Sequence, residues 1–262
     1  VFDAQGYARL NNLLGLLALT LKSEVDLAGG AHSRHDLALA VKTLGEKGLT
    51  ERGVPPGRYP PAALKSAGAT RLEQQPYQRM SWLTGLLPHL GQSALYEKIE
   101  FDASWQDPRN WLAARTIVPQ FLDPQYPDQA RYATPADIGV EMAATHVVGI
   151  AGVGLDSAEY PLNDPAYSAK RGAFGYDGSA ALADIAKGRG LSNVAVAIQI
   201  PHDGITGVSP WIAGGGATVR GVPEKNSIAP FVLSTDRNGK PIQHNGKRGT
   251  PVIMADGSVR FV

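Results

Sequence analysis

Apolar residues in the first fifty positions recur with the period of an α-helix. Two groups follow a spacing of about 3.6 residues and are separated by Gly29-Gly30: Leu10, Leu13, Leu14, Leu17 and Leu21, then Leu37, Val41 and Leu44. The leucine run is only twelve residues long and contains Asn11 and Asn12, which favours a packed amphipathic helix over a membrane anchor. We therefore predict a helical N-terminal segment over residues 1–52, followed by a Pro- and Gly-rich linker or loop over 53–75.

Shorter helical segments are expected in the middle of the chain. Ser81 is a typical N-cap for a short apolar helix, which we expect to be interrupted at Pro88. Residues 92–99 predict one or two further helical turns. Asp107 followed by Pro108 indicates another helix start, because proline fits the first helical position.

Strands are expected mainly beyond residue 144. Short β-branched runs bounded by Gly or Pro occur at 145–150, 194–200, 231–234, 252–255 and 258–262. A helical segment followed by a strand-rich segment is typical of an α+β fold rather than of alternating βαβ units. We therefore expect one α+β domain over residues 76–262.

The chain ends in a pattern typical of a β-hairpin. Asp256-Gly257 lies between two apolar runs, which predicts a two-residue type I′ turn. The predicted buried face carries two cross-strand pairs, Met254 with Val259 and Val252 with Phe261. The opposite face would then carry Ile253 and the surface residue Arg260.

Composition narrows the function classes. Lys and Arg number 25 against 24 Asp and Glu, so no basic field favours nucleic acid as a partner. Cysteine is absent, which excludes disulfides, thiolate metal sites and a cysteine nucleophile. No apolar run reaches the length of a membrane span, and the sequence starts at Val1 rather than Met. We expect a processed or trimmed product, with membrane contact only through an upstream anchor that this chain does not contain.

Two patterns could be taken for ligand sites, and the residues favour neither. Gly149, Gly152 and Gly154 do not follow the G-x-G-x-x-G order, so a tight loop is favoured over a nucleotide site. His32 and His35 have a spacing that suits a metal, but no nearby residue completes the site.

Calcium is the one cofactor that the residues suggest. Asp156, Glu159 and Asp164 form an acidic loop, in which Asp156 and Asp164 are the weak calcium candidates. The loop lacks the regular spacing of an EF-hand, so a solvated loop is the favoured interpretation, and we expect no obligate cofactor.

A hydrolytic triad is a further alternative. His202-Asp203 or His244 could orient a serine, and the serines considered are Ser179, Ser192 and Ser258. None lies in the G-x-S-x-G elbow of an α/β-hydrolase, so the residues favour no catalytic site.

Several segments share order and character with motifs of one known family. They are residues 80–90 with 94–96, 144–154, 172–176, 183–193 with Pro210-Trp211, and the terminal segment 244–262. Together they resemble the pseudopilin-like family designated domain of unknown function 1559, over roughly residues 76–262. Residues 58–62 are similar to the segment that follows the N-terminal helix in that family.

The chain also departs from the family pattern. The loop between His244 and Asp256 is longer than is usual, and Asp123-Pro124 stands where many members carry Cys-Pro. The prepilin leader and hydrophobic N-terminal helix of typical members are not seen in this sequence.

The resemblance implies a pilin-like α+β fold. An N-terminal helical segment would pack on an antiparallel sheet that ends in the C-terminal hairpin. His244, Asp256 and Gly257 would then form a structural motif, a turn that glycine fits, with polar side chains satisfying its backbone.

The expected function is non-enzymatic. The resemblance implies an extracytoplasmic structural or assembly subunit, in the periplasm, cell envelope or cell surface, with protein partners or self-assembly. The alternative is a module that captures a glycan or protein through loops near Trp105, Trp111 and Trp211. A hydrolase that uses His202 or His244 ranks third.

Overall fold

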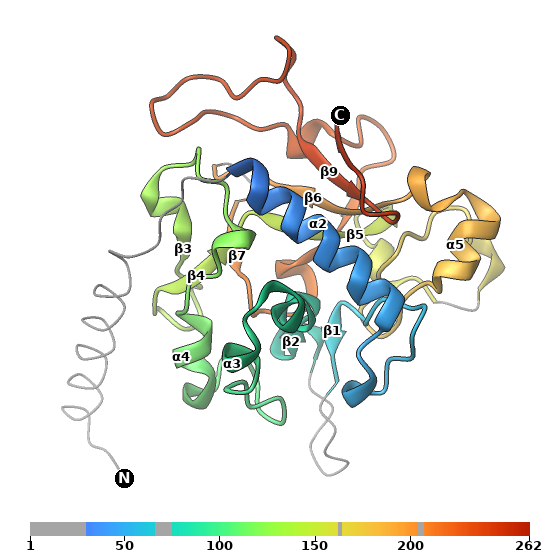
Figure 1. Cartoon of the computed structure of the whole chain (residues 1–262), viewed down its shortest axis with the longest axis horizontal. Coiled ribbons are helices and arrows are strands. Elements are labelled where there is room, and N and C mark those ends of the chain that lie inside the picture. Colours follow the sequence, from blue (N-terminus) through green and yellow to red (C-terminus); the bar gives the residue numbers. More distant parts are fainter. Residues whose placement is uncertain (1–29, 66–74, 162–163, 204–206) are drawn as a thin grey trace.

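The computed structural model describes residues 30–65, 75–161, 164–203 and 207–262, with side chains described from Arg34 onward (Figure 1). The predicted leucine helix over residues 10–21 lies outside the described residues, as does the segment 66–74 of the predicted linker. Within the described residues the chain is a mixture of helices and several small sheets, which confirms the α+β class.

Helix α2, Gly30–Lys47, begins at the predicted glycine break. Its apolar positions Leu37, Val41 and Leu44 are buried in the main core, as their spacing predicted. The helix contacts the helical segments η3, Trp82–Leu90, and η5, Pro119–Phe121. Figure 1 shows it crossing in front of the central sheet. Burial of this apolar stripe is therefore what holds α2 on the domain.

The central sheet has five strands in the order β10-β9-β6-β5-β8. These strands are β5 Val147–Val153, β6 Ala195–Gln199, β8 Val219–Val222, β9 Pro251–Met254 and β10 Val259–Phe261. All of them lie beyond residue 144, as expected. The sheet is mixed, however, because β8 runs parallel to β5 while the other pairs are antiparallel. The expectation of an antiparallel sheet was wrong for this pair of strands. The chain leaves the sheet after β6 and returns as β8, which lies beside β5 and runs in the same direction.

Both faces of the central sheet are covered. Ala151, Ala197 and Ile253 belong to the main core, which also contains the apolar side of α2. Val148, Ile198, Val252 and Met254 belong to a second apolar cluster on the other side.

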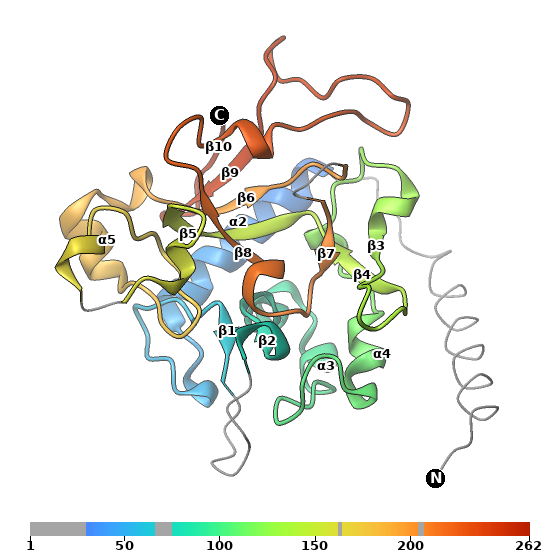
Figure 2. The ribbon, with the colours of Figure 1, turned by 180° about the vertical axis from the view of Figure 1, so that it is seen from behind.

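Two smaller sheets lie beside the central one, and Figure 2 shows them from behind. One consists of β3 Tyr132–Ala133, β4 Met142–Thr145 and β7 Ser209–Pro210; the other pairs β1 Ala63–Leu64 with β2 Met80–Ser81. The predicted strand 145–150 is thus shared between β4 and β5, with His146 at the junction. The predicted strand 231–234 was wrong, because Phe231 ends the short helix η11, Ala229–Phe231, and packs in the second apolar cluster without strand pairing.

The remaining helical segments are short. They are η1 Thr50–Arg52, η2 Pro76–Gln78, η3 Trp82–Leu90, α3 Ser93–Tyr96, η4 Pro108–Asn110, α4 Trp111–Ala114, η5 Pro119–Phe121, η6 Asp128–Arg131, η7 Ser157–Glu159, η8 Pro165–Tyr167, α5 Leu182–Gly188, η9 Leu191–Asn193, η10 Gly215–Ala217 and η11 Ala229–Phe231. Of the described helices, none combines the length and apolar character that crossing a bilayer requires.

Two of the predicted helix starts are confirmed by their caps. The Ser81 hydroxyl accepts a hydrogen bond from the Leu83 amide at 3.0 Å, and Asp107 accepts one from the Arg109 amide at 3.0 Å. The expected break at Pro88 was wrong, because η3 continues to Leu90. Burial of its leucines offsets the hydrogen-bond donor that proline lacks.

The C-terminal hairpin forms, but with a register one residue away from the prediction. Val259 pairs with Ile253 and Arg260 with Val252, so the loop has three residues, 255–257. Gly257 has a φ of +83°, and its amide donates to Met254 O at 2.9 Å. Asp256 does not share the positive φ that a type I′ turn needs at both central positions, so a three-residue loop closed by a left-handed glycine forms instead.

The slipped register changes which residues of the hairpin are buried. Val252 and Met254 are buried as predicted, and Ile253 is buried on the opposite face of β9. Strand β10 lies at the edge of the sheet, with Val259 41% exposed and Phe261 half-buried. The predicted burial of Val259 and Phe261 was therefore wrong, because no further strand within the described residues covers this edge.

Candidate functional site

The Asp256-Gly257 turn rests on helix α2. Asp256 Oδ1 accepts hydrogen bonds from the Ser258 amide at 2.9 Å and the Ser258 hydroxyl at 2.7 Å. The Ser258 hydroxyl, together with its amide, lowers the pKa of Asp256. A Cβ added to Gly257 would lie 3.1 Å from Lys42 Cβ, so a glycine allows this close approach to the helix. The turn therefore positions the start of β10 against α2.

His244 lies in a separate turn. Its backbone exchanges hydrogen bonds with Lys247, at 2.9 and 3.0 Å, across Asn245 and Gly246, which both have positive φ. The His244 ring lies 5.2 Å from the Phe261 ring, between centroids. Among the hydrogen bonds of the described residues, none joins His244 to Asp256. His244 thus contacts the end of β10, while Asp256 and Gly257 shape its beginning.

The two calcium candidates take part in local hydrogen bonds. Asp156 Oδ1 accepts from the Tyr160 hydroxyl at 2.9 Å, and Asp164 Oδ1 accepts from the Ala166 amide at 2.9 Å as the cap of η8. In the described part of the chain, no three acidic or histidine side chains are grouped closely enough to hold a metal ion. Each of these two carboxylates therefore stabilises its own loop through a hydrogen bond.

The glycines at the end of β5 and in the loop that follows it are packing features. Gly152 has a φ of +136°, and a Cβ added there would lie 2.2 Å from Lys170 O. The same loop approaches β8 so closely that a Cβ on Gly221 would lie 1.8 Å from Gly154 O. These glycines let backbone segments touch, which accounts for their presence without a nucleotide.

The structure does not assemble the triad candidates. The His202 ring bonds the Thr235 carbonyl at 3.0 Å, and Asp203 accepts from the Ser234 hydroxyl. The Ser179 hydroxyl is buried and donates to Tyr59 O. Within the described residues, none of these hydrogen bonds connects a candidate serine to a candidate histidine.

A buried polar cluster that the sequence did not predict lies where α2 meets the sheets. Asp123 forms an ion pair with Arg34 of α2 at 2.6 Å and accepts a hydrogen bond from the Gln199 amide of β6. The Asp123 amide donates to His146 Nδ1 at 2.7 Å, and the Tyr126 hydroxyl donates to Ile200 O at 2.7 Å. The cluster therefore joins α2, β6 and the junction between β4 and β5.

The bonding of His146 defines its protonation. Because Nδ1 accepts from the Asp123 amide, the proton resides on Nε2, which donates to Ala130 O at 2.7 Å. Burial lowers the pKa of His146 to about 4, so the ring is neutral near pH 7. Both ring nitrogens have partners, which indicates a structural role rather than an acid–base role. The sequence marked Asp123 only as a departure from the resembled family, where many members carry cysteine, and gave no sign of its buried partners.

The tryptophans of the alternative binding hypothesis are poorly placed for stacking on a glycan. Trp105 and Trp211 are buried, and their indole N–H groups donate to Tyr77 O at 2.7 Å and Thr116 O at 3.0 Å. Trp111 is partly buried and donates to Gln106 O at 2.9 Å. These rings act as core and anchoring residues in this structure.

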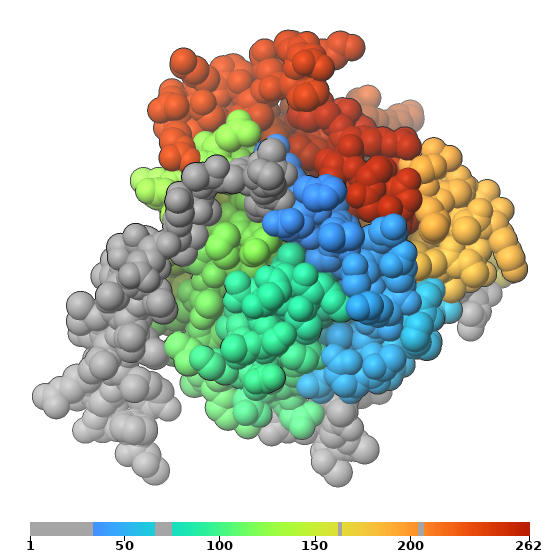
Figure 3. Space-filling view, in the orientation of Figure 1, coloured from blue at the N-terminus to red at the C-terminus, as the bar shows by residue number. Residues whose placement is uncertain are grey.

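Helix α2 and the C-terminal hairpin both carry exposed apolar side chains. Leu39 of α2 is 55% exposed, and Val259 and Val262 are 41% and 46% exposed. We call these three residues and the outer edge of β10 the α2–β10 surface. Figure 3 shows the helix beside the C-terminal hairpin on one face of the molecule, and α2 contacts β10.

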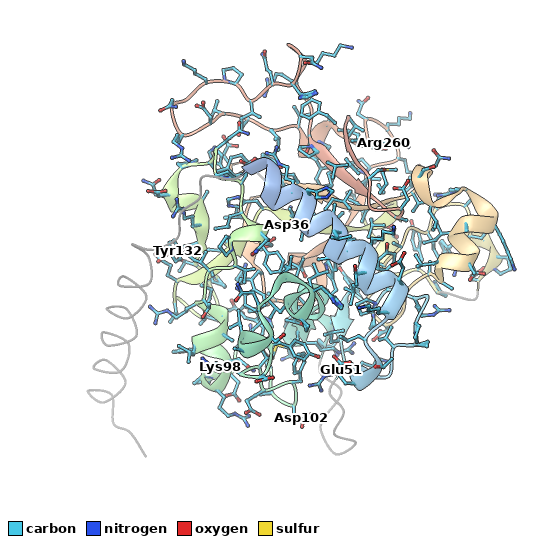
Figure 4. All side chains as sticks on the ribbon, in the orientation of Figure 1. Asp36, Glu51, Lys98, Asp102, Tyr132 and Arg260 are labelled. Carbon is cyan, nitrogen blue, oxygen red and sulfur yellow. The ribbon has the colours of Figure 1, made fainter. Side chains whose placement is uncertain are left out.

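The outer edge of β10 carries backbone groups that β9 cannot bond. Across the hairpin, the backbone of Met254 bonds that of Ser258, and the backbone of Thr250 bonds that of Val262. Val259 and Phe261 alternate with the bonded positions, so their backbone N–H and C=O groups point away from β9. Figure 4 shows Arg260 on this hairpin and Asp36 on α2, both exposed. An uncovered strand edge of this kind is a template for pairing with another chain.

Comparison with known proteins shows a family relationship. A family model described as "Protein of unknown function (DUF1559)" matches residues 51–199, which is more than half of the chain. The match extends from η1 to the end of β6 and therefore leaves α2, β8 and the hairpin outside. No curated protein and no solved structure matches the chain.

Proposed function

Because this chain belongs to the DUF1559 family, whose function is unknown, we propose a role from its own features: a non-enzymatic structural or assembly subunit that acts outside the cytoplasm. Its motifs resemble those of pseudopilins, and α2 packs lengthwise on an α+β domain, as the spine of a pilin-like subunit would. The polar groups considered for catalysis are engaged in local structural bonds, which supports a role without turnover.

The α2–β10 surface carries this proposal. Leu39 of α2, Val259 of β10 and Val262 are exposed, α2 contacts β10, and the described strands leave the outer edge of β10 unpaired. Addition of a strand from a second subunit would satisfy the edge, and contact with Leu39 and Val259 would remove apolar area from water. We therefore expect subunits to associate through this surface.

Sedimentation velocity over a range of concentrations tests this expectation. The wild-type chain should associate as its concentration rises, and Val259→Lys should weaken the association at least tenfold, because a buried charge on the edge is strongly unfavourable. Leu112→Lys is the matched control, since Leu112 is 51% exposed on α4, away from the surface. It should associate like the wild type.

Two results would contradict the proposal. One is a wild-type chain that stays monomeric at every concentration and forms no crosslinks through a photoreactive residue at position 259. The other is association that Val259→Lys and Leu112→Lys weaken equally. Crosslinking at position 259 to a different protein would instead assign the surface to a heterologous partner and retain the assembly role.

A further inference from the structure

A cavity of about 440 Å³ lies between helix α5 and the loops that face it. Its lining includes three arginines from separate parts of the chain: Arg58, Arg171 and Arg189. Arg58 precedes β1, Arg171 follows η8, and Arg189 immediately follows α5. Three arginines thus line one cavity, although the chain as a whole has a net charge of only +1.

Backbone contacts hold the three arginines in place. Arg58 forms a bridge with Ala181, and Arg171 forms one with Gly152 of β5. The Arg189 amide donates to Ile185 O at 3.1 Å, and its carbonyl accepts from the Asn193 side chain at 3.0 Å. The backbones that carry these side chains are therefore fixed before any ligand binds, which reduces the entropy cost of binding.

Each guanidinium also bonds a backbone carbonyl. Arg58 donates to Ser179 O, Arg189 donates to Ala169 O, and Arg171 donates to Pro161 O at 3.1 Å. A guanidinium has five N–H donors, so one such bond orients the group and leaves further donors for a ligand.

The charge of these arginines is not balanced by ion pairs. Arg34, Arg79, Arg109 and Arg131 each lie within 2.8 Å of a carboxylate oxygen. In contrast, Arg58, Arg171 and Arg189 form no ion pair with any described carboxylate. Asp184 is the carboxylate among the lining residues, so three positive charges and one negative charge give these residues a net charge of +2.

We propose that this cavity binds a doubly charged oxyanion, a phosphate or sulfate group, either free or carried as an ester on a larger molecule. A dianion would neutralise the net charge of the lining. A tetrahedral group also offers acceptors in several directions, which suits guanidiniums from three chain segments. A single carboxylate would match one guanidinium and leave the other charges uncompensated.

Isothermal titration calorimetry with sodium sulfate and sodium phosphate, at ionic strength held constant with sodium chloride, tests the proposal. Saturable binding is expected for both anions and not for acetate. Arg171→Gln and Arg189→Gln should each weaken binding about tenfold, because each removes a charge-assisted hydrogen bond. Lys187→Gln is the matched control, since it removes a positive charge from α5 outside the cavity lining and should change affinity less than about twofold.

The same titrations are then made with two esters, glucose 6-phosphate and a sulfated disaccharide. Tighter binding of either ester than of the free anion assigns the ester as the ligand form, whereas weaker binding assigns the free anion. Arg189 is exposed, so Arg189→Gln should retain the wild-type circular dichroism spectrum and melting temperature. No saturable binding by any of these ligands, or equal losses in Arg189→Gln and Lys187→Gln, would overturn the proposal. Neither result depends on association through the α2–β10 surface.

Discussion

The polar cluster around Asp123 and the outer edge of β10 show two opposite uses of polar groups. In the cluster, Asp123, Gln199 and His146 are buried and bond one another or nearby backbone. At β10, the backbone groups of Val259 and Phe261 point outward from the edge of the sheet, and the Val259 side chain is exposed. The first arrangement stabilises a single fold, because a buried polar group without a partner is costly, and the second leaves a surface available to another chain.

The largest effect is expected from Asp123→Ala. This change removes the ion pair with Arg34 and leaves Gln199 and the Gln125 amide without their acceptor. Loss of one partner from a buried pair should lower the free energy of unfolding by about 3–5 kcal/mol, measured by urea denaturation. Asp128→Ala is the control, since the Asp128–Arg131 pair is largely exposed on the Asp128 side and should cost about 0–1 kcal/mol. Equal costs for the two variants would show that the cluster does not stabilise the fold.

The second effect concerns pH. Burial lowers the pKa of His146 from 6.5 to about 4. The folded state favours the neutral ring, so protonation of His146 favours unfolding. The contribution of the neutral ring to the free energy of unfolding is complete above pH 6.5 and is lost as the pH falls from 6.5 towards 4. The expected loss is on the order of 3 kcal/mol.

Urea denaturation between pH 7.5 and pH 4.5 measures this contribution. His146→Gln should be less stable than the wild type at pH 7.5 and should show a flatter decline in stability over the range. The exposed His35 supplies the control, and His35→Gln should keep the wild-type slope. A wild-type slope in His146→Gln would mean that other groups cause the decline.

The third effect concerns the turn before β10. Gly257→Val should cost on the order of 1–3 kcal/mol, because valine is strained at positive φ and its Cβ would approach Lys42. Gly239→Val is a useful comparison, since Gly239 also has positive φ but a Cβ there would meet nothing within 4 Å. The difference between the two melting curves isolates the contact with α2. If the two costs are equal, the turn is not held by the helix.

The smallest effects are expected on β10 itself. Phe261→Ala should cost about 1–2 kcal/mol rather than the roughly 3–5 kcal/mol of a buried phenylalanine, because the ring is half-buried at the edge. Arg260→Ala should change stability by no more than about 0.5 kcal/mol, since Arg260 is exposed. Denaturant melts at low protein concentration test both. A cost for Phe261→Ala equal to that for Met254→Ala would show that β10 is covered in solution.

Local signals in the sequence were reliable where short-range chemistry decides the structure. The caps at Ser81 and Asp107 and the apolar stripe of α2 were predicted because each depends on residues within a few positions of one another. Strand β6 was predicted for the same reason, from its β-branched composition. The resemblance on which the family prediction rested is confirmed over residues 51–199.

Features that depend on distant segments were missed or wrong. The hairpin register followed from backbone angles at Asp256 and from the contact of Gly257 with Lys42, which a pattern of alternating residues does not reveal. The 231–234 segment has strand-like composition, yet Phe231 is buried by packing without strand pairing.

The sequence by itself determined the α+β class, the family, the capped helix starts and the buried side of α2, because these are encoded by neighbouring residues. Only the tertiary structure decided that Asp123 meets Arg34 and Gln199, that β10 is an edge, and that three arginines share one cavity. Arg58 and Arg171 are separated by more than a hundred residues, and neither lies in a recognisable motif. Their proximity arises from bridges to Ala181 and Gly152, contacts that exist only once the chain has folded.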